Sequence, residues 1–283
     1  MVWTWQGVGM PRPGSGPEFI ESLARGLEVI TAFEAGAGSM SLSEVAGRTG
    51  LARPTVRRIL LTLEELGYVR SEGSRFSLTP RVLDLGTTYV ASQGLWQVAR
   101  PHMEVLSAKT DESCSIAQLD GSDIVYVARV AVPKIVALSV QIGTRFPALP
   151  TSLGKVLLAA LDPDQVDEVL ALPTRSGLTP LWQPGREERD EALREVRARG
   201  WAMTDQQLAL GIRSVAVPVR DGDHRVVAAL NVNTHAAETS VEYLLDHHLP
   251  LLQRAAGDIG ADFARLHALP RRTSGIIDPD SRP

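Results

Sequence analysis

Three arginines, Arg53, Arg57 and Arg58, stand at the start of an apolar stretch, TGLARPTVRRILLTL at residues 49–63. An arginine guanidinium is a planar donor that can bind a guanine edge or a phosphate through two parallel hydrogen bonds. The apolar residues recur at helical spacing, so they would form the buried stripe of a helix and leave the arginines outside. Polar side chains off this stripe, with two on the hairpin that follows, are candidate DNA contacts: Arg53, Thr55, Arg57, Arg58, Thr62, Arg70 and Arg75.

The alternative for these arginines is a solvated surface on which they pair with Glu44, Glu64 or Glu65. Residues 19–81 hold eight arginines and seven glutamates, so this segment is close to neutral. The whole chain has a formal net charge of −4, which argues against indiscriminate coating of nucleic acid or of acidic lipid. Any contact with DNA must therefore be local, and we expect it to depend on placement and on dimerisation.

A second candidate site lies in LPTSLGKVLLA, where Thr151 and Ser152 precede an apolar helix. The first N–H groups of a helix have no intrahelical acceptor and attract a carboxylate. The alternative is that Thr151 only caps the helix and that Lys155 lies on the surface. The cations near these elements that can neutralise a bound carboxylate are Arg129, Lys134, Arg145 and Arg213.

Asn231 and Asn233 alternate by two in LNVNT, so they share one face of a strand. Asparagine is depleted in strands, so two amides on one face favour a binding pocket over side chains that only fill space. A hydrogen-bonded structural pair is the alternative.

The motifs of common enzyme sites are incomplete. LGKV lacks both the earlier glycine and the following Ser or Thr of a phosphate-binding loop, and TSLG lacks the first glycine of a nucleophile elbow. The adjacent His247 and His248 would point about 100° apart on a helix, unlike a metal-binding i, i+4 pair. Cys114, on an apolar strand, is expected to be a small core residue. We therefore expect no catalytic site, metal or cofactor.

Length and composition limit the class of protein. A chain of 283 residues with 44% hydrophobic content has room for two globular domains, and no apolar run approaches the roughly 20 residues of a membrane helix. The N-terminal MVWTWQGVGMPRPGSGP lacks the pattern of a signal peptide and predicts a disordered tail. A single cysteine excludes an internal disulfide framework and fits the reducing cytoplasm.

The elements predicted up to residue 80 follow the order of a winged helix-turn-helix. Leu23, Leu27, Ile30 and Phe33 give 22–33 a helical stripe. A capping box at Ser41 begins a second helix, which ends at Gly50. Pro54 suits the first turn of a third helix, whose apolar face is Val56, Ile59, Leu60, Leu63 and Leu66 and which ends at Gly67. Two β-like runs follow at 68–70 and 75–78.

The remaining elements predict an α+β domain with a mainly antiparallel sheet. Residues 80–94 form a linking helix, 95–110 a helix that kinks or restarts at Pro101, and 113–130 a hairpin that turns at Asp120-Gly121. A strand at 135–143, short helices at 151–161 and 163–172, and an exposed helix ending at Gly200 come next. A long hairpin through Asp221-Gly222 and a closing helix interrupted at Pro250 complete the domain. The expected division is a tail at 1–17, a winged domain at 18–80, a linker helix at 81–94, an effector-binding domain at 95–269 and a tail at 270–283.

Several segments carry a resemblance to a known family: LSEVAGRTGLARPTVRRILLTLEELGYV, FSLTPRVLDLG, DESCSIAQLDGSDIVYVARV, IGTRFPALPTSLGKVLLA and RARGWAMTDQQLALGIRSVAVPV. Over about residues 20–265 the chain resembles the IclR family of bacterial transcriptional regulators, and within it the regulators of aromatic-acid breakdown of the β-ketoadipate pathway.

The resemblance implies a GAF-like sensory domain that binds a small carboxylate effector. It also implies a palindromic operator, a homodimer that pairs into a tetramer, and RNA polymerase as a further candidate partner. Carried over residue by residue, the implied effector contacts are Leu138, Phe146, Ser152, Leu153, Thr204, Asp205, Ser214, Asn231 and Asn233. The alternative from another class of protein is a metabolic enzyme or sensor that binds a small acid and whose helical N-terminus contacts proteins.

Overall fold

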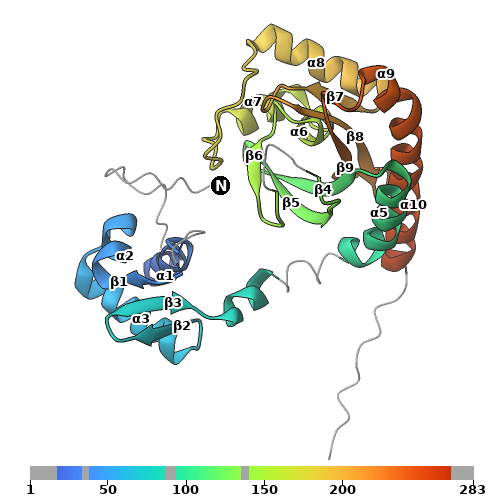
Figure 1. Ribbon diagram of the computed structural model, residues 1–283. Helices are drawn as coiled ribbons and strands as arrows, with labels where there is room; N and C mark the ends of the chain where they lie inside the picture. The colour runs from blue at the N-terminus through green and yellow to red at the C-terminus, as the bar shows by residue number, and fades with distance from the viewer. Residues whose placement is uncertain (1–17, 34–37, 87–93, 135–139, 269–283) are drawn as a thin grey trace, which may run out of the picture. The chain divides into compact units, whose positions relative to one another are not determined.

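The structure is a computed structural model that describes residues 18–33, 38–86, 94–134 and 140–268 (Figure 1). The chain divides into two compact units, Met1–Ser92 and Gln93–Pro283. No helix in the described ranges is both long and apolar enough to cross a membrane.

The N-terminal unit is a winged helix-turn-helix, as the element order predicted. Its bounds are α1 (Glu21–Thr31), β1 (Met40–Ser41), α2 (Leu42–Thr49), α3 (Arg53–Glu65), β2 (Val69–Glu72) and β3 (Arg75–Leu78). The two-residue strand β1, which the sequence did not indicate, pairs with β3, so the small sheet has the order β1-β3-β2. A 3₁₀ turn at Pro80–Val82 leads into a helical stretch at residues 83–86, and the rest of the expected linker helix lies outside the described residues.

The predicted helix ends are present in this unit. The Ser41 N–H donates to Glu44 Oε2 at 2.7 Å, and the Glu44 N–H donates to Ser41 Oγ at 3.3 Å, which completes the capping box. Gly50 ends α2 with φ of 65°, a left-handed conformation that glycine adopts without steric cost. Pro54 lies in the first turn of α3, where a missing N–H costs nothing. The unit closes over a core of Val29, Met40, Val45, Val56, Leu60, Leu63 and Val69.

The face that α1 buries differs from the predicted one. Leu23 and Leu27 were expected inside, but their side chains are 60% and 50% exposed, and Val29 is buried instead. Leu66 at the end of α3 is also half exposed. These leucines border an apolar groove between α1 and α3 that also includes Leu85. Helical periodicity identifies an apolar stripe, but it does not say whether the same unit covers that stripe.

The C-terminal unit is built on a six-stranded antiparallel sheet of order β6-β5-β4-β9-β8-β7. The strands are β4 (Ser113–Asp120), β5 (Asp123–Val130), β6 (Arg145–Pro147), β7 (Ala202–Asp205), β8 (Ile212–Arg220) and β9 (Val226–His235). The hairpins turn at the predicted Asp-Gly pairs, and Gly121 has φ of 64°.

Helices cover both faces of this sheet. The long helices α5 (Leu95–Thr110) and α10 (Leu249–Ala268) pack side by side over one face, and their core includes Met103, Ile116 and Leu230 (Figure 1). On the other face α6 (Ser152–Ala159) packs against the strands and α8 (Arg186–Arg199) packs against α6, while α7 (Pro163–Leu170) adds Val166 to the same core. Successive strand residues alternate between these two layers because side chains of a strand point to opposite faces.

Four predictions for this unit need correction. The strand expected at 135–143 is absent from residues 140–143, whereas 135–139 lie outside the described residues; β6 forms just after it. Helix α5 runs through Pro101 without a break. Thr204 and Asp205 lie on strand β7, not on a loop, as Figure 1 shows for that strand. Before α10, α9 (Val241–Tyr243) continues into a π-helical turn, Leu244–His248, so the interruption precedes Pro250.

Candidate DNA-binding surface and ligand pocket

The three arginines of α3 are exposed and keep their guanidinium groups available. Arg53, Arg57 and Arg58 take part in none of the ion pairs among the described residues. The glutamates proposed as partners are engaged elsewhere: Glu44 caps α2 and lies 3.7 Å from Arg75, and Glu64 accepts hydrogen bonds from Ser71. Among the described residues these arginines therefore show the solvated surface of that alternative but not its ion pairs.

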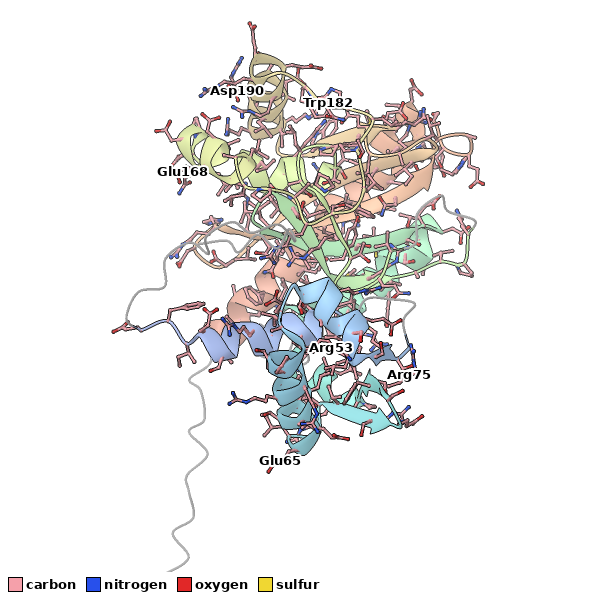
Figure 2. All side chains as sticks on the ribbon, turned by 90° about the vertical axis from the view of Figure 1, so that its left-hand side faces the viewer. Arg53, Glu65, Arg75, Glu168, Trp182 and Asp190 are labelled. Carbon is pink, nitrogen blue, oxygen red and sulfur yellow. The ribbon has the colours of Figure 1, made fainter. Side chains whose placement is uncertain are left out.

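The polar side chains of α3 divide between two sides of the helix. Arg53 and Arg57 lie about 40° apart around the helix axis, at 100° per residue. Thr55, Arg58 and Thr62 line the apolar groove beside α1, and the Thr62 hydroxyl donates to the Arg58 carbonyl at 2.9 Å. Figure 2 labels Arg53 at the start of α3 and Glu65 at its end. Of the α3 candidates, Arg53 and Arg57 lie away from that groove.

The hairpin arginines are exposed but held by neighbours. Arg70 donates to Ser77 Oγ at 3.0 Å. Arg75 donates from Nε to Ser39 Oγ at 2.8 Å and from Nη2 to the Ser39 carbonyl at 2.6 Å. About half or more of each side chain stays exposed, so both guanidinium groups are oriented yet accessible.

In the C-terminal unit, a pocket opens between the sheet and the start of α6. About 770 Å³ of space, open solvent included, lies among its lining residues. Six of the predicted effector contacts line it: Phe146, Ser152, Thr204, Ser214, Asn231 and Asn233. Leu153 is fully buried in the core behind the pocket, Asp205 does not line it, and Leu138 lies outside the described residues.

Strand pairing brings the polar pocket residues together in two rows. Ser113 pairs with Asn233, Asn233 with Ser214, and Ser214 with Thr204, so one row crosses four strands. In the next row Arg129 pairs with Ser115, and Ser115 pairs with Asn231. Residues between these positions, such as Cys114 and Val232, belong to the opposite core. At the pocket end of the central strands, one face is thus polar and the other is apolar.

The asparagine amide at the centre of the pocket is almost completely buried, with 2% of Asn231 exposed. Its Nδ2 donates to Ser214 Oγ at 3.1 Å and to Asn233 Oδ1 at 3.0 Å. The hydroxyls of Ser214 and Ser152 lie 2.6 Å apart and share a hydrogen bond. Asn231 Oδ1 is buried and has no hydrogen-bond partner among the described residues.

Helix α6 begins at the edge of this pocket. Thr151 caps it: its Oγ1 accepts from the Gly154 N–H at 2.9 Å and donates to the Ala148 carbonyl at 2.8 Å. The first N–H groups, of Ser152 and Leu153, have no intrahelical acceptor. A side chain at Gly154 would collide with the backbone of Ala148, because its Cβ would lie 2.0 Å from the Ala148 oxygen. This close approach places the turn before α6 against the sheet.

The four candidate cations have different surroundings. Arg213 forms a two-point ion pair with Asp205, and Arg145 pairs with Asp120. Lys134 lines the pocket but lies 2.9 Å from Glu112 Oε1. Arg129 lines the pocket, donates to Ser115 Oγ at 3.0 Å and forms none of the ion pairs among the described residues.

Burial acts on the charged groups of the pocket. It lowers the pKa of Arg129, and the opposing effects of Tyr126 and Cys114 are smaller. It also raises the pKa of Glu112, and the opposing effect of Lys134 is smaller. Both shifts indicate a pocket that solvates charge poorly. In such a pocket an anionic partner interacts strongly with an unpaired cation.

Lys155 is buried, contrary to the surface position considered from sequence, and is only 5% exposed. Its Nζ donates to Gln207 Oε1 at 2.6 Å and lies 4.3 Å from the centre of the Trp182 ring, which Figure 2 labels near α8. Burial, followed by repulsion from Arg199, lowers the pKa of this amine to about 8. The lysine therefore joins α6 to the segment between β7 and β8 that supplies Leu208 to the pocket.

Sequence reasoning missed several lining residues, among them Ser113, Tyr126 and Thr234. Tyr126 packs edge-on against Phe146 with ring centroids 5.8 Å apart, and it forms an apolar wall. The alternation along 123–130 is the signal that would have assigned Tyr126 to a face. Cys114 is a buried core residue whose pKa burial raises to about 12, and the described residues contain no group of three metal-ligating side chains.

Comparison with known proteins covers both units. Residues 22–73 match the IclR helix-turn-helix domain, and residues 87–261 match the bacterial transcriptional regulator IclR C-terminal family. The chain is 39% identical over 244 residues to the Pca regulon regulatory protein of Pseudomonas putida, across 86% of this chain and 84% of that protein.

Two solved structures are also similar. A transcriptional regulator from Rhodococcus sp. RHA1 is 47% identical, with a TM-score of 0.77 over 88% of this chain and all of that one. The inducer-binding domain of a double mutant of the PobR transcription factor from Acinetobacter, solved with 3-hydroxybenzoic acid, is 32% identical. Its TM-score is 0.53 over 58% of this chain and 96% of that one.

Proposed function

We propose that this chain, which belongs to the IclR family of bacterial transcriptional regulators, binds a small aromatic carboxylate in the C-terminal pocket and an operator through α3. The observation that carries the ligand proposal is Arg129. Its guanidinium is partly buried in the pocket without a carboxylate at ion-pair distance in the described part of the chain. Such a cation favours an anionic ligand, and the rings of Tyr126 and Phe146 favour a flat apolar body.

Further support comes from the polar set around Arg129. Ser152, Thr204, Ser214, Asn231 and Asn233 act in this proposal as hydrogen-bonding groups, and Phe146 acts as a wall. Leu153 contributes its backbone N–H at the start of α6, since its side chain is in the core. Asp205 contributes indirectly by holding Arg213, and Leu138 is retained as a wall on the family resemblance alone. The relative solved with 3-hydroxybenzoic acid supports the same class of ligand.

Removal of the charge at Arg129 is the direct test of the ligand site. Aromatic carboxylates at about 100 times their Kd should stabilise the wild-type protein by about 2.7 kcal/mol, because they bind only the native state. Arg129→Gln should lose most of this thermal shift while the free protein still unfolds cooperatively. The control is Arg225→Gln, which removes an exposed guanidinium from the β8–β9 turn. An unchanged shift in Arg129→Gln would contradict the proposal.

For DNA, Arg53, Arg57 and Arg58 act as the major-groove contacts, Thr55 and Thr62 as flanking contacts, and Arg70 and Arg75 as backbone contacts of the wing. The winged domain covers 18–80, the linker helix 81–94 and the effector domain 95–269. The protein would act in the cytoplasm, where the operator is, and would present RNA polymerase with a ligand-dependent complex.

The apolar groove of the N-terminal unit is proposed to take a second copy of the same unit. Leu23, Leu27, Leu66 and Leu85 are each at least half exposed around it. A dimer pairs two recognition helices on a palindromic operator and covers these leucines, and two dimers would give a tetramer. In this arrangement Thr55, Arg58 and Thr62 lie next to the dimer contact as well as to DNA.

A polar substitution of the α1 leucines tests this dimer. The double variant Leu23→Ser with Leu27→Ser should lower the average mass measured by sedimentation, because it removes apolar side chains that the second copy would cover. The unit should still fold, since these half-exposed leucines lose little intramolecular packing. Operator affinity should fall together with the average mass. The matched control is Leu210→Ser, another exposed leucine, in the C-terminal unit. A variant with unaltered association and operator affinity would place the dimer contact elsewhere.

A further inference from the structure

A lysine is buried beside the pocket without a carboxylate at ion-pair distance in the described part of the chain. Lys155 is 5% exposed on α6, one turn after Ser152 of the pocket, and its Nζ contacts Gln207 Oε1 and the ring of Trp182. An amide oxygen and an aromatic face replace only part of the hydration of an ammonium ion. The charged form of this side chain is therefore less stable here than it would be in water.

The loop at residues 206–211, between β7 and β8, separates the pocket from solvent. Leu208 lines the pocket and is 7% exposed, whereas Leu210 is 72% exposed on the outside of the same loop. Displacement of this loop would remove one wall of the pocket and open it to solvent.

This loop is fixed at its ends and held in its middle at one residue. At the ends, the Gln206 N–H donates to the Ile212 carbonyl at 2.7 Å, and the Gly211 N–H donates to Gln206 Oε1 at 3.1 Å. In the middle, the Gln207 carbonyl accepts from the Trp182 N–H at 2.9 Å, and the Gln207 side chain accepts from the buried lysine. A loop with fixed ends can open locally when the contacts of its middle are released.

We propose that the loop at residues 206–211 is the gate of the pocket and that the positive charge of Lys155 favours its open form. The inference rests on the proposed function for the ligand that passes the gate. When the loop and Trp182 move away, water reaches the ammonium group, and the penalty of burying its charge disappears. The charge therefore acts against closure of the loop, and loss of the proton stabilises the closed form.

The charged groups around Lys155 compensate its charge only weakly. On α8, Arg199 repels the ammonium group, and Glu195 and Glu188 attract it without forming an ion pair among the described residues. Further charged or titratable groups on the elements packed against α6 hold other partners: Arg197 with the Ala159 carbonyl, Asp120 with Arg145, Asp123 with Thr174, Tyr126 with Phe146, Arg129 with Ser115, Asp205 with Arg213, Arg220 with the His224 carbonyl, and His235 with the Ala237 N–H.

The direction of the pH dependence follows from these surroundings. Burial, followed by repulsion from Arg199, lowers the pKa of Lys155 to about 8 in the closed loop, whereas an amine in water keeps a pKa of about 10.5. Closure therefore releases a proton between these two values and is favoured as the pH rises. At pH 7 the amine is charged, and its charge favours opening.

Thiol labelling of a cysteine placed in the loop tests the gate without a ligand. Leu208→Cys puts a thiol on the inner side of the loop, so a water-soluble thiol reagent reaches it when the loop opens. The single native cysteine, Cys114, is buried and gives the background rate. At pH 7 we expect Lys155→Met, which keeps the length of the side chain without its charge, to slow this labelling by about 10-fold or more. The control Lys109→Met removes an exposed charge in the last turn of α5 and should leave the rate unchanged.

The pH profile separates the charge of Lys155 from a structural role of its side chain. The ratio of the labelling rates with and without the lysine, taken at one pH so that ionisation of the thiol cancels, should fall about 10-fold between pH 7 and pH 9. A lysine that only tied the loop to α6 would give faster labelling in Lys155→Met. Equal or faster labelling in that variant, or a ratio that does not change with pH, would overturn the inference.

The exchange of a bound ligand connects the gate with the pocket. In protein without the added cysteine, Lys155→Met should slow the dissociation of 3-hydroxybenzoate, measured by stopped-flow displacement, by the same factor as the labelling. The Kd should change little, because the gate limits entry and exit alike. Dissociation at the wild-type rate would show that the ligand leaves by another route and would overturn the gate. Absence of binding by both benzoate and 3-hydroxybenzoate would count against the proposed function instead, and the labelling rates would still decide whether the charge opens the loop.

Discussion

Operator affinity is expected to fall by about 100-fold or more when Arg57 and Arg58 are both replaced by alanine. Each arginine at a base edge or phosphate contributes about 1–3 kcal/mol to binding, and both guanidinium groups are exposed without an ion pair among the described residues. Neither side chain belongs to the buried core of the unit, so the free energy of unfolding should change little. Fluorescence anisotropy with a labelled operator, over a series of salt concentrations, measures the loss.

The matched control for this pair is Arg194→Ala with Arg265→Ala. These are exposed arginines of the C-terminal unit, and their removal changes the net charge of the protein by the same amount. The control should bind the operator with nearly wild-type affinity. If the Arg57 and Arg58 variant also binds like the wild type at every salt concentration, α3 does not contact the operator through these residues.

The second large effect is expected from a single methyl group. In Gly154→Ala the new Cβ would lie 2.0 Å from the Ala148 oxygen and 2.4 Å from the Ala148 carbonyl carbon. Both atoms belong to the backbone and cannot rotate away, so α6 or the turn at 148–151 must shift. Overpacking of this kind costs about 1–3 kcal/mol, and the shift would also displace Thr151 and Ser152 from the pocket. Chemical denaturation and ligand titration measure the two consequences.

Gly257→Ala is the control because Gly257 lies in α10, where an added Cβ has no atom within 4 Å. Alanine is a better helix former than glycine, so this variant should be stabilised by about 0.5–1 kcal/mol. Equal stability of Gly154→Ala and the wild type would show that the turn before α6 can move freely.

The predictions that succeeded depend on local chemistry. The capping box of Ser41 and Glu44 and the Asp120-Gly121 turn are determined by residues within a few positions of one another. Those that failed depend on distant neighbours. Strand β7 has four residues and forms because β8 pairs with it, and Lys155 is buried because α6 is enclosed by the sheet, α8 and the Trp182 segment.

The pocket shows the same division between local and distant information. Six residues that the family resemblance implied as effector contacts line the pocket. For Ser152, Asn231 and Asn233 a local pattern points to the same place: a hydroxyl at a helix start and a polar pair at period two. The sequence did not single out Arg129 from the four cations. That choice depends on which carboxylates the fold brings near each cation, and Asp205, Asp120 and Glu112 occupy the other three. The prediction for the leucines of α1 failed for a related reason. Their stripe is apolar, yet it lies outside the core of the N-terminal unit.

At their pocket end the central strands are apolar on one side and polar on the other, and this separates two kinds of mutational change. Residues such as Ser113, Asn231 and Asn233 can be exchanged without altering the layer that α5 and α10 pack against, because their neighbours in sequence point the opposite way. A scaffold of this kind can acquire a new ligand preference without repacking that apolar layer. Its ligand preference is therefore a good target for redesign as a biosensor.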